Sequence, residues 1–174
     1  CRVVGEGAVG VCGVLAARLL GAEGIVAMGH HEDRLDLAEQ FGATETVAAR
    51  GEEAVERATE LTYGCANHVL ECVGAASAMD TAIEVCRPGG TVGYVGIPYG
   101  VAEEGLDVFG LFGDNVTLAG VATVRAHAEE LIADVLQRTL DSAPIVTETV
   151  DLDGVAEGYR VTDEREAIEV LVKP

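Results

Sequence analysis

The chain has 174 residues, of which 49% are hydrophobic, and this suits one domain or one domain with a short appendage. Asp and Glu number 30 against 11 Lys and Arg, a formal net charge of −19 that would repel phosphate backbones and anionic membranes. No apolar run is long enough to cross a bilayer, and no signal segment is recognisable. We therefore expect binding to neither nucleic acid nor membranes.

The acidic residues are spread along the whole chain, and Lys173 is the only lysine. A dispersed acidic surface keeps a protein hydrated in concentrated salt, where self-repulsion is screened within about 3 Å at 1 M. The pattern favours a high-salt cytoplasm over an ordinary one. The five cysteines form no Cys-x-x-Cys pair and indicate reduced core residues rather than disulfides or zinc ligands; they are Cys1, Cys12, Cys65, Cys72 and Cys86.

Apolar runs of strand length alternate with segments of helical period, which predicts parallel βαβ units. The predicted strands are residues 2–4, 24–28, 46–49, 67–72, 91–97 and 116–121. The predicted helices span about 8–20, 33–41 and 51–63, followed by a segment carrying Met79, Ala82, Ile83 and Cys86. A long last helix is predicted to carry Ala128, Leu131, Ile132, Val135 and Leu136. The first strand begins almost at residue 1, which indicates a piece of a longer protein.

Two later segments break this alternation. Residues 99–115 are predicted to form a loop, whose Phe109, Leu111 and Phe112 indicate a covered surface, either an interface or anchors in the core. Residues 144–174 are predicted to form a strand, a short helix and another strand. We therefore expect one domain over residues 1–143 and a separate C-terminal segment over 144–174. The glycine-rich turn in the first of these indicates a dinucleotide-binding domain.

The stretch GEGAVG follows the first strand and opens the first helix. Gly5 permits a tight turn, Gly7 lets the backbone approach a pyrophosphate, and Gly10 lets the helix pack on the strand. The helix N-terminus then presents free N–H groups and a positive dipole end to the anion. This context predicts an α/β fold of Rossmann type, a doubly wound parallel sheet of about six strands that binds a dinucleotide.

The ribose-binding residue is less regular. An acidic residue is usual about 20 residues past the fingerprint, at the end of the second strand, but here that position falls near Gly29. A small residue would not repel a 2′-phosphate, and His30, His31 and Arg34 could donate hydrogen bonds to it. The sequence thus favours NADP(H), with NAD(H) and a ribose bound by Glu32 as the alternative.

Taken together, GEGAVG, LAEQFGATETV, HVLECVG, CRPGGTVGYVGIPYG and VAEGYRVTDEREAIEVLVKP resemble the zinc-dependent medium-chain alcohol dehydrogenases. The resemblance covers essentially all 174 residues. It matches the coenzyme-binding half of that family and the C-terminal segment that returns to its catalytic domain. It implies hydride transfer between a nicotinamide coenzyme and an alcohol or carbonyl substrate.

The resemblance also assigns coenzyme contacts. Gly5, Gly7, Ala8, Val9 and Gly10 would bind the pyrophosphate, and Gly29, His30, His31 and Arg34 would select NADP or NAD. Cys72 and Val73 would flank the adenosine, and Val95, Gly96, Ile97 and Val121 would lie beside the nicotinamide. The 116–121 strand and the 109–112 segment would form a subunit interface, giving a homo-oligomer, either a dimer or a tetramer.

Two departures accompany the resemblance. Glu169 stands where family members often carry a basic residue that supports the pyrophosphate. The family's zinc ligands precede the glycine turn, and no histidine here pairs with a cysteine at ligand spacing. We expect zinc only in the full-length protein, supplied by a missing N-terminal catalytic domain, and no catalytic residue or turnover in this chain alone.

Three other classes of protein share parts of this pattern. An S-adenosylmethionine methyltransferase can carry a PGG before a late strand, but prefers a different glycine spacing after an acidic strand residue. A zinc-free quinone reductase would share the coenzyme fold. A nucleotide-sensing domain without chemistry would have no use for the strands of 144–174.

Overall fold

The computed structural model describes residues 1–61, 66–120 and 127–174. The chain divides into two compact units, 1–122 and 123–174. The sequence placed a functional boundary at 143/144, and that assignment stays a prediction. None of the described helices is both long enough and apolar enough to cross a membrane.

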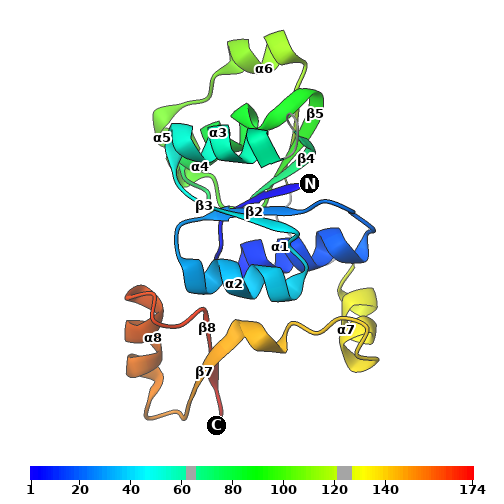
Figure 1. Cartoon of the computed structure of the whole chain (residues 1–174). Coiled ribbons are helices and arrows are strands. Elements are labelled where there is room, and N and C mark those ends of the chain that lie inside the picture. Colours follow the sequence, from blue (N-terminus) through cyan, green and yellow to red (C-terminus); the bar gives the residue numbers. More distant parts are fainter. Residues whose placement is uncertain (62–65, 121–126) are drawn as a thin grey trace. The chain divides into compact units, whose positions relative to one another are not determined.

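The first unit is built on a six-stranded sheet in which every pairing is parallel (Figure 1). The strand order is β3-β2-β1-β4-β5-β6, so the chain winds outward in both directions from β1 and β4. The strands are β1 (Arg2–Val4), β2 (Val26–Gly29), β3 (Glu45–Ala48), β4 (Ala66–Glu71), β5 (Cys86–Tyr94) and β6 (Thr117–Gly120). The predicted doubly wound sheet is confirmed.

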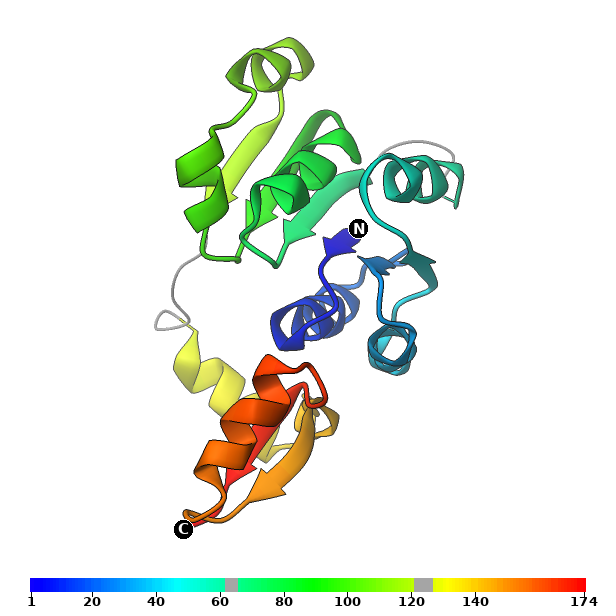
Figure 2. The ribbon, with the colours of Figure 1, turned by 90° about the vertical axis from the view of Figure 1, so that its left-hand side faces the viewer.

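Helices cover both faces of this sheet: α1 and α2 lie on one face, and α3 and α4 on the other (Figures 1 and 2). The helices of this unit are α1 (Ala8–Leu19), α2 (Glu32–Phe41), α3 (Gly51–Leu61), α4 (Ala76–Glu84), α5 (Tyr99–Glu104) and α6 (Val108–Asp114). Because both faces are covered, the inner strands bury apolar residues on both sides, among them Val3, Val4, Val26 and Val69.

The α2 helix illustrates how the sequence sets an element. Leu35, Ala38 and Phe41 recur at helical spacing, and all three are buried, as predicted. Gly42 ends the helix in the left-handed conformation, with a φ of 117°, where its N–H closes the last turn. Glu32 and Asp33 lie in the first turn, where acidic side chains suit the helix dipole.

Two sequence-based assignments in the first unit were wrong. Cys86 lies in β5, not in the preceding helix, since β5 begins there and pairs with Ala66 before a register shift. Residues 99–115 are not one loop but contain α5 and α6, and the side chain of Asp107 caps α6 by accepting from the N–H of Gly110. Phe109 and Phe112 are 85% and 83% exposed, so they do not anchor the core.

The second unit contains a two-stranded parallel sheet of β7 (Val146–Val150) and β8 (Glu169–Val172), joined by α8 (Val155–Asp163). It begins with α7 (Ala128–Leu136) and a short 3-10 turn, Ala143–Ile145. The predicted strand, helix and strand of 144–174 are therefore present. Gly158 and Val161 are the points of α8 that are buried.

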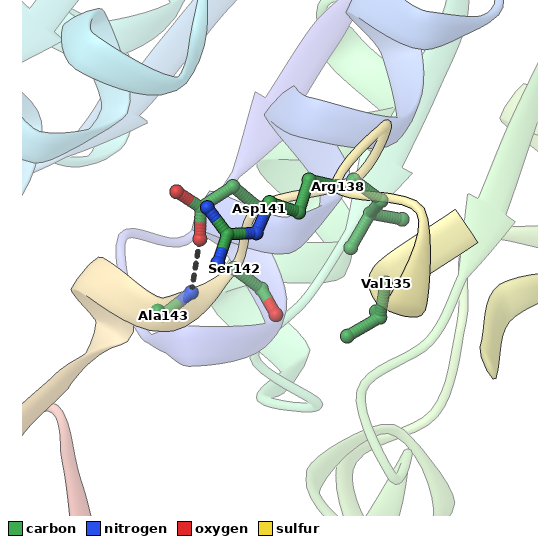
Figure 3. A pocket seen from close by; sticks show the side chains of 6 residues that line it. Val135, Arg138, Asp141, Ser142 and Ala143 are labelled. Carbon is green, nitrogen blue, oxygen red and sulfur yellow. Dashed lines mark hydrogen bonds between the residues drawn. The ribbon is translucent and has the colours of Figure 1, made fainter. Parts of the chain in front are cut away.

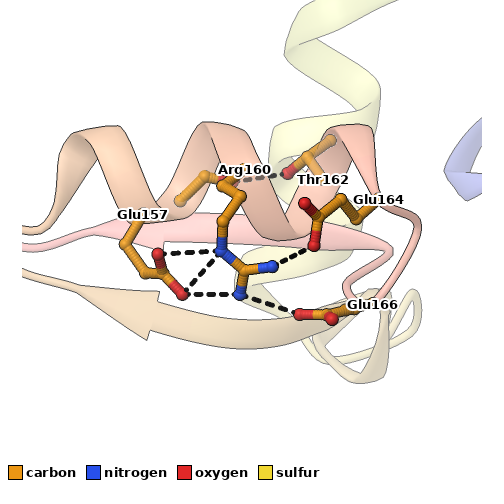
Figure 4. A network of polar contacts seen from close by, with 6 residues as sticks. Glu157, Arg160, Thr162, Glu164 and Glu166 are labelled. Carbon is orange, nitrogen blue, oxygen red and sulfur yellow. Dashed lines mark hydrogen bonds and ion pairs between the residues drawn. The ribbon is translucent and has the colours of Figure 1, made fainter.

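The surface of α8 carries a cluster of ionic contacts around one cation (Figure 4). The Arg160 guanidinium binds Glu157 and Glu164 on the helix and Glu166 in the segment that follows it. Hydrogen bonds from Arg160 lower the pKa of Glu157. One arginine thus joins the helix to the chain that leads into β8, within a strongly acidic surface.

Candidate functional site

The turn that follows β1 brings two backbone segments unusually close together. Gly5 has a φ of +113°, a left-handed conformation that a side chain would strain. A Cβ at Gly10 would lie only 1.8 Å from the carbonyl oxygen of Gly5. The first turn of α1 can therefore rest against the glycine turn only because residue 10 has no side chain.

This arrangement leaves the N-terminus of α1 accessible. Gly7 is the N-cap residue and provides no side chain to accept from the first-turn N–H groups. A Cβ placed on Gly7 would meet no atom within 4 Å, and Val9 is 47% exposed. Backbone donors and the positive end of the helix dipole thus face a surface that an anion can reach.

The sheet places two further segments beside this turn. The N–H of Cys72 donates to the carbonyl of Val4 at 2.9 Å, so residues 72–74 leave β4 next to the glycine turn. The backbones at Gly96 and Gly74 also pack closely, because a Cβ on Gly96 would lie 2.3 Å from the nitrogen of Gly74. The segments 5–10, 72–74 and 95–97, each of which contains predicted site residues, therefore form one continuous surface at the carboxyl ends of β1, β4 and β5.

A buried carboxylate that the sequence analysis missed holds two of these segments together. Glu71 is fully buried, and its Oε1 accepts from the N–H groups of Val73 and Gly74, each at 2.7 Å. Its backbone carbonyl accepts from Val95 and Gly96 at 2.8 and 3.2 Å. The glutamate in the apolar run HVLEC is the feature of the sequence that could have indicated this, because a buried carboxyl group needs hydrogen-bond donors around it.

The thiol of Cys72 is not a reactive group. Burial, with smaller contributions from Glu71 and Cys12, raises its pKa to about 12. It is therefore protonated and neutral at ordinary pH, and only the thiolate is a nucleophile or a metal ligand. This supports a packing role for Cys72 beside the glycine turn.

The end of β2 holds a second unexpected carboxylate. Glu6, between the first two glycines of the turn, points across to residues 29–31 and is buried. Its Oε1 accepts from the backbone N–H of His30 at 3.3 Å and lies 2.6 Å from Nδ1 of His31 and 3.1 Å from Nδ1 of His30. The two imidazole rings lie together, with centroids 3.8 Å apart.

The charge of Glu6 follows from these contacts. Burial on its own would raise the pKa of Glu6, but hydrogen bonds from His31 and from the His30 backbone outweigh it and hold the pKa below its ordinary value. Glu6 is therefore a carboxylate at neutral pH. Glu6 occupies a variable position of the glycine fingerprint, and nothing in its local pattern indicates where its side chain points.

Arg50, which follows β3, completes this cluster and was also missed. Its guanidinium lies within hydrogen-bonding distance of Nε2 of His30. Because a guanidinium can only donate, Nε2 is the acceptor and Nδ1 of His30 carries the proton that points to Glu6. In the described ranges 1–61, 66–120 and 127–174, Glu6, His30 and His31 are the one group spaced for a metal ion. The hydrogen bonds among these three side chains account for that spacing without a metal ion.

The remaining predicted residues are placed as follows. Arg34 is partly buried in α2, and Glu32 is exposed at the start of that helix. Val121 lies outside the described residues. Thus Gly29, His30 and His31 form one cluster with the fingerprint residue Glu6, and the expected small residue at position 29 does not leave the site without a carboxylate.

The second unit has a hollow of its own, of about 510 Å³ (Figure 3). Asp141 accepts from the N–H of Ala143 at its edge. No predicted site residue lines it; its walls are Val135, Arg138, Leu140, Asp141, Ser142 and Ala143. Nothing in its lining indicates chemistry, so the glycine turn remains the candidate site.

A glycine turn at the reversal point of a doubly wound parallel sheet defines the class of this protein, the Rossmann-type dinucleotide-binding folds. The family model described as zinc-binding dehydrogenase matches residues 8–169. The chain therefore belongs to the zinc-binding dehydrogenase family, and the resemblance seen in the sequence is confirmed.

Relatives and solved structures agree with this assignment. The chain is 31% identical over 169 residues to a probable zinc-binding alcohol dehydrogenase of Mycobacterium tuberculosis, covering 97% of this chain and 43% of that protein. A zinc-type alcohol dehydrogenase-like protein of Escherichia coli is 29% identical over 98% of this chain and 48% of that protein. The alcohol dehydrogenase of Thermus sp. ATN1 superposes with a TM-score of 0.90 at 29% identity, over 99% of this chain and 50% of that one. This chain thus spans about half the length of these proteins.

Gly7 and Gly10, two of the three glycines of the turn, make separable predictions. Gly10→Ala should lower stability by about 3 kcal/mol, because its methyl group would overlap a backbone carbonyl that cannot move aside. Gly7→Ala should leave the melting temperature nearly unchanged, since its Cβ meets open space. It should weaken dinucleotide binding about tenfold by holding the phosphate away from charge-assisted hydrogen bonds. Thermal unfolding and calorimetric titration check both; equal melting temperatures for the two variants would contradict the steric argument.

The lowered pKa of Glu6 predicts a dependence of stability on pH. Its contribution is complete above the pKa of an unfolded-chain glutamate, about 4.3, and is lost as the pH falls through the lower pKa of the folded state. Wild type should therefore exceed Glu6→Gln in stability at neutral pH, with the difference shrinking in acid. Urea unfolding midpoints measure it, with Glu56→Gln on the surface of α3 as control. A difference that grows in acid would contradict the assigned direction.

Proposed function

We propose that the chain is the coenzyme-binding part of a zinc-type alcohol dehydrogenase-like oxidoreductase. The observation that supports this most directly is the accessible glycine turn at the N-terminus of α1, in a chain whose family match runs over residues 8–169. The reaction is hydride transfer between a nicotinamide coenzyme and an alcohol or carbonyl substrate. The nicotinamide carries the hydride, and the protein binds and orients it.

The pyrophosphate is proposed to bind at the glycine turn, through Gly5, Gly7, Ala8, Val9 and Gly10. The adenosine is flanked by Cys72 and Val73, and the nicotinamide lies beside Val95, Gly96, Ile97 and Val121. In support, the apolar side chains around the turn are left open to solvent: Val73 is 53% exposed, Val95 36% and Ile97 67%. A bound coenzyme would cover this apolar surface, which is otherwise unfavourable to expose.

Zinc and the substrate are proposed to involve protein outside this sequence. The family's metal, when bound, supplies a Lewis acid that polarises the substrate oxygen. The described residues of this chain offer no cluster for it apart from Glu6, His30 and His31, whose contacts are already explained. The partner that completes the enzyme is thus an N-terminal catalytic domain, and 144–174 is the segment that completes it in turn.

Two exposed features support further association. Phe109 and Phe112 stand on α6, almost fully exposed, and β6 is the outer strand of the sheet. An open strand edge and exposed aromatic side chains are suited to pairing with a second copy. We include a homo-oligomer, dimer or tetramer, in the proposal.

The proposed division of labour can be tested with this chain. It should bind NADH or NADPH, because the glycine turn is complete, yet show no alcohol-dependent reduction of NAD or NADP. Coenzyme binding is followed by the change in nicotinamide fluorescence, and turnover by absorbance of the reduced nicotinamide. Gly7→Ala, which keeps the stability of the fold and weakens dinucleotide binding, serves as the control. Alcohol oxidation by the chain above that control would refute the assignment of catalysis to another domain.

The acidic surface extends the proposal to a cytoplasm of high salt content. With a net charge of −19 and Lys173 as the only lysine, self-repulsion should unfold the chain when it is unscreened. The folded circular-dichroism signal should therefore be lost as KCl falls below about molar concentration, where the Debye length exceeds about 3 Å. A stability that does not vary with salt would identify an acidic protein of ordinary cytoplasm instead.

A further inference from the structure

The position of Glu6 changes what the end of β2 can bind. The sequence favoured NADP(H) because a glycine at position 29 would remove the carboxylate that repels a 2′-phosphate. In the structure a Cβ on Gly29 would lie 2.4 Å from Oε2 and 2.5 Å from Cδ of Glu6. The space beside residue 29 is therefore filled by a carboxylate that arrives from the glycine turn.

We propose that Glu6 is the residue that binds the adenosine ribose and makes the site select NAD(H) over NADP(H). The inference rests on the proposed coenzyme-binding function. It assigns to a variable position of the fingerprint the role that an acidic residue at the end of the second strand usually has. Glu6 performs that role from the first loop of the fold, across the ends of two neighbouring strands.

The contacts of Glu6 orient it for this role. The donors from His30 and His31 all converge on Oε1, which fixes the carboxylate at the end of β2. Its Oε2 is turned toward Gly29, and a carboxylate can accept about four hydrogen bonds in all. Acceptor capacity therefore remains for the hydroxyl groups of a ribose that reaches this end of the sheet.

The charges favour a free ribose over a phosphorylated one. Glu6 is ionised at neutral pH, and a 2′-phosphate adds a charge of about −1.5 to −2. Nδ1 of His30 is directed at Glu6, while its Nε2 is bound by Arg50, so both of its ring nitrogens are engaged. Bringing a phosphate in would place a second anion beside this carboxylate, and the ring nitrogens of His30 could bind it only by giving up these hydrogen bonds.

The test compares two coenzymes that differ only in the 2′-phosphate. Calorimetric titration of the 174-residue chain with NADH and NADPH, in high salt, should give tighter binding of NADH. Glu6→Gln keeps the size of the side chain but removes the charge. It should weaken NADH about ten- to a hundredfold, as expected for loss of charged hydrogen bonds, and weaken NADPH less or not at all. Glu32→Gln, which changes the alternative ribose ligand, should leave both affinities unchanged.

A rescue experiment guards against simple misfolding. Glu6→Ala vacates the space beside residue 29, and Gly29→Asp in that background returns a carboxylate from the strand itself. The double variant should recover the preference for NADH that Glu6→Ala loses. Gly29→Asp on its own should melt at a lower temperature than the double variant, because its side chain and Glu6 would occupy the same space.

The outcomes distinguish a failure of the proposed coenzyme binding from a failure of the role assigned to Glu6. If neither coenzyme binds the wild-type chain, the proposed function fails. If both bind but NADPH binds at least as tightly as NADH, the role of Glu6 is refuted and the function stands. The same holds if Glu6→Gln changes neither affinity, or if Glu32→Gln reduces NADH binding in its place. Tighter NADH, lost in Glu6→Gln and recovered in the double variant, supports the inference.

Discussion

The contact between residue 10 and the carbonyl of Gly5 is the constraint on which the rest of the site depends. No side-chain atom fits there, so α1 can begin directly against the end of β1. Because the two segments lie so close, the first N–H groups of the helix face open space, and the course of residues 5–7 between β1 and α1 is fixed. Glu6 lies within this short turn, and its side chain reaches the end of β2 on one side of β1. The accessible helix end and the buried carboxylate thus belong to one tightly packed turn.

A second constraint acts on the other side of β1. The Oε1 of the buried Glu71 accepts from two backbone N–H groups, and two more donate to its main-chain oxygen, while its Oε2 has no hydrogen-bond partner in the part of the chain that the structure describes. Breaking the bonds to Oε1 would leave a second buried oxygen without a donor, which is unfavourable. These bonds therefore hold the segments after β4 and β5 in one arrangement beside the glycine turn.

Much of the fold followed from the sequence because parallel sheets leave strong local signals. Short apolar runs in the strands, the helical spacing of Leu35, Ala38 and Phe41, and the glycine spacing each indicate the local structure of their own segment. The errors fell where that signal weakens: α5 and α6 are too short to show a helical period, and Cys86 fits a helix until its pairing with β4 is known. Glu6 and Arg50 could not be placed at all, because their partners lie 25 and 20 residues away in the chain. A carboxylate at the end of β2 was expected to come from that strand, whereas in the structure it comes from the glycine turn, as Glu6.

The shared space of residues 6 and 29 has a consequence for how this fold can change over generations. A Cβ at position 29 would lie within 2.5 Å of the Glu6 carboxyl group unless Glu6 moved, so neither substitution is neutral with respect to the other. A lineage that moves its carboxylate from one position to the other avoids this overlap only if the old side chain is lost before the new one is gained. That route passes through a sequence with no acid at either position.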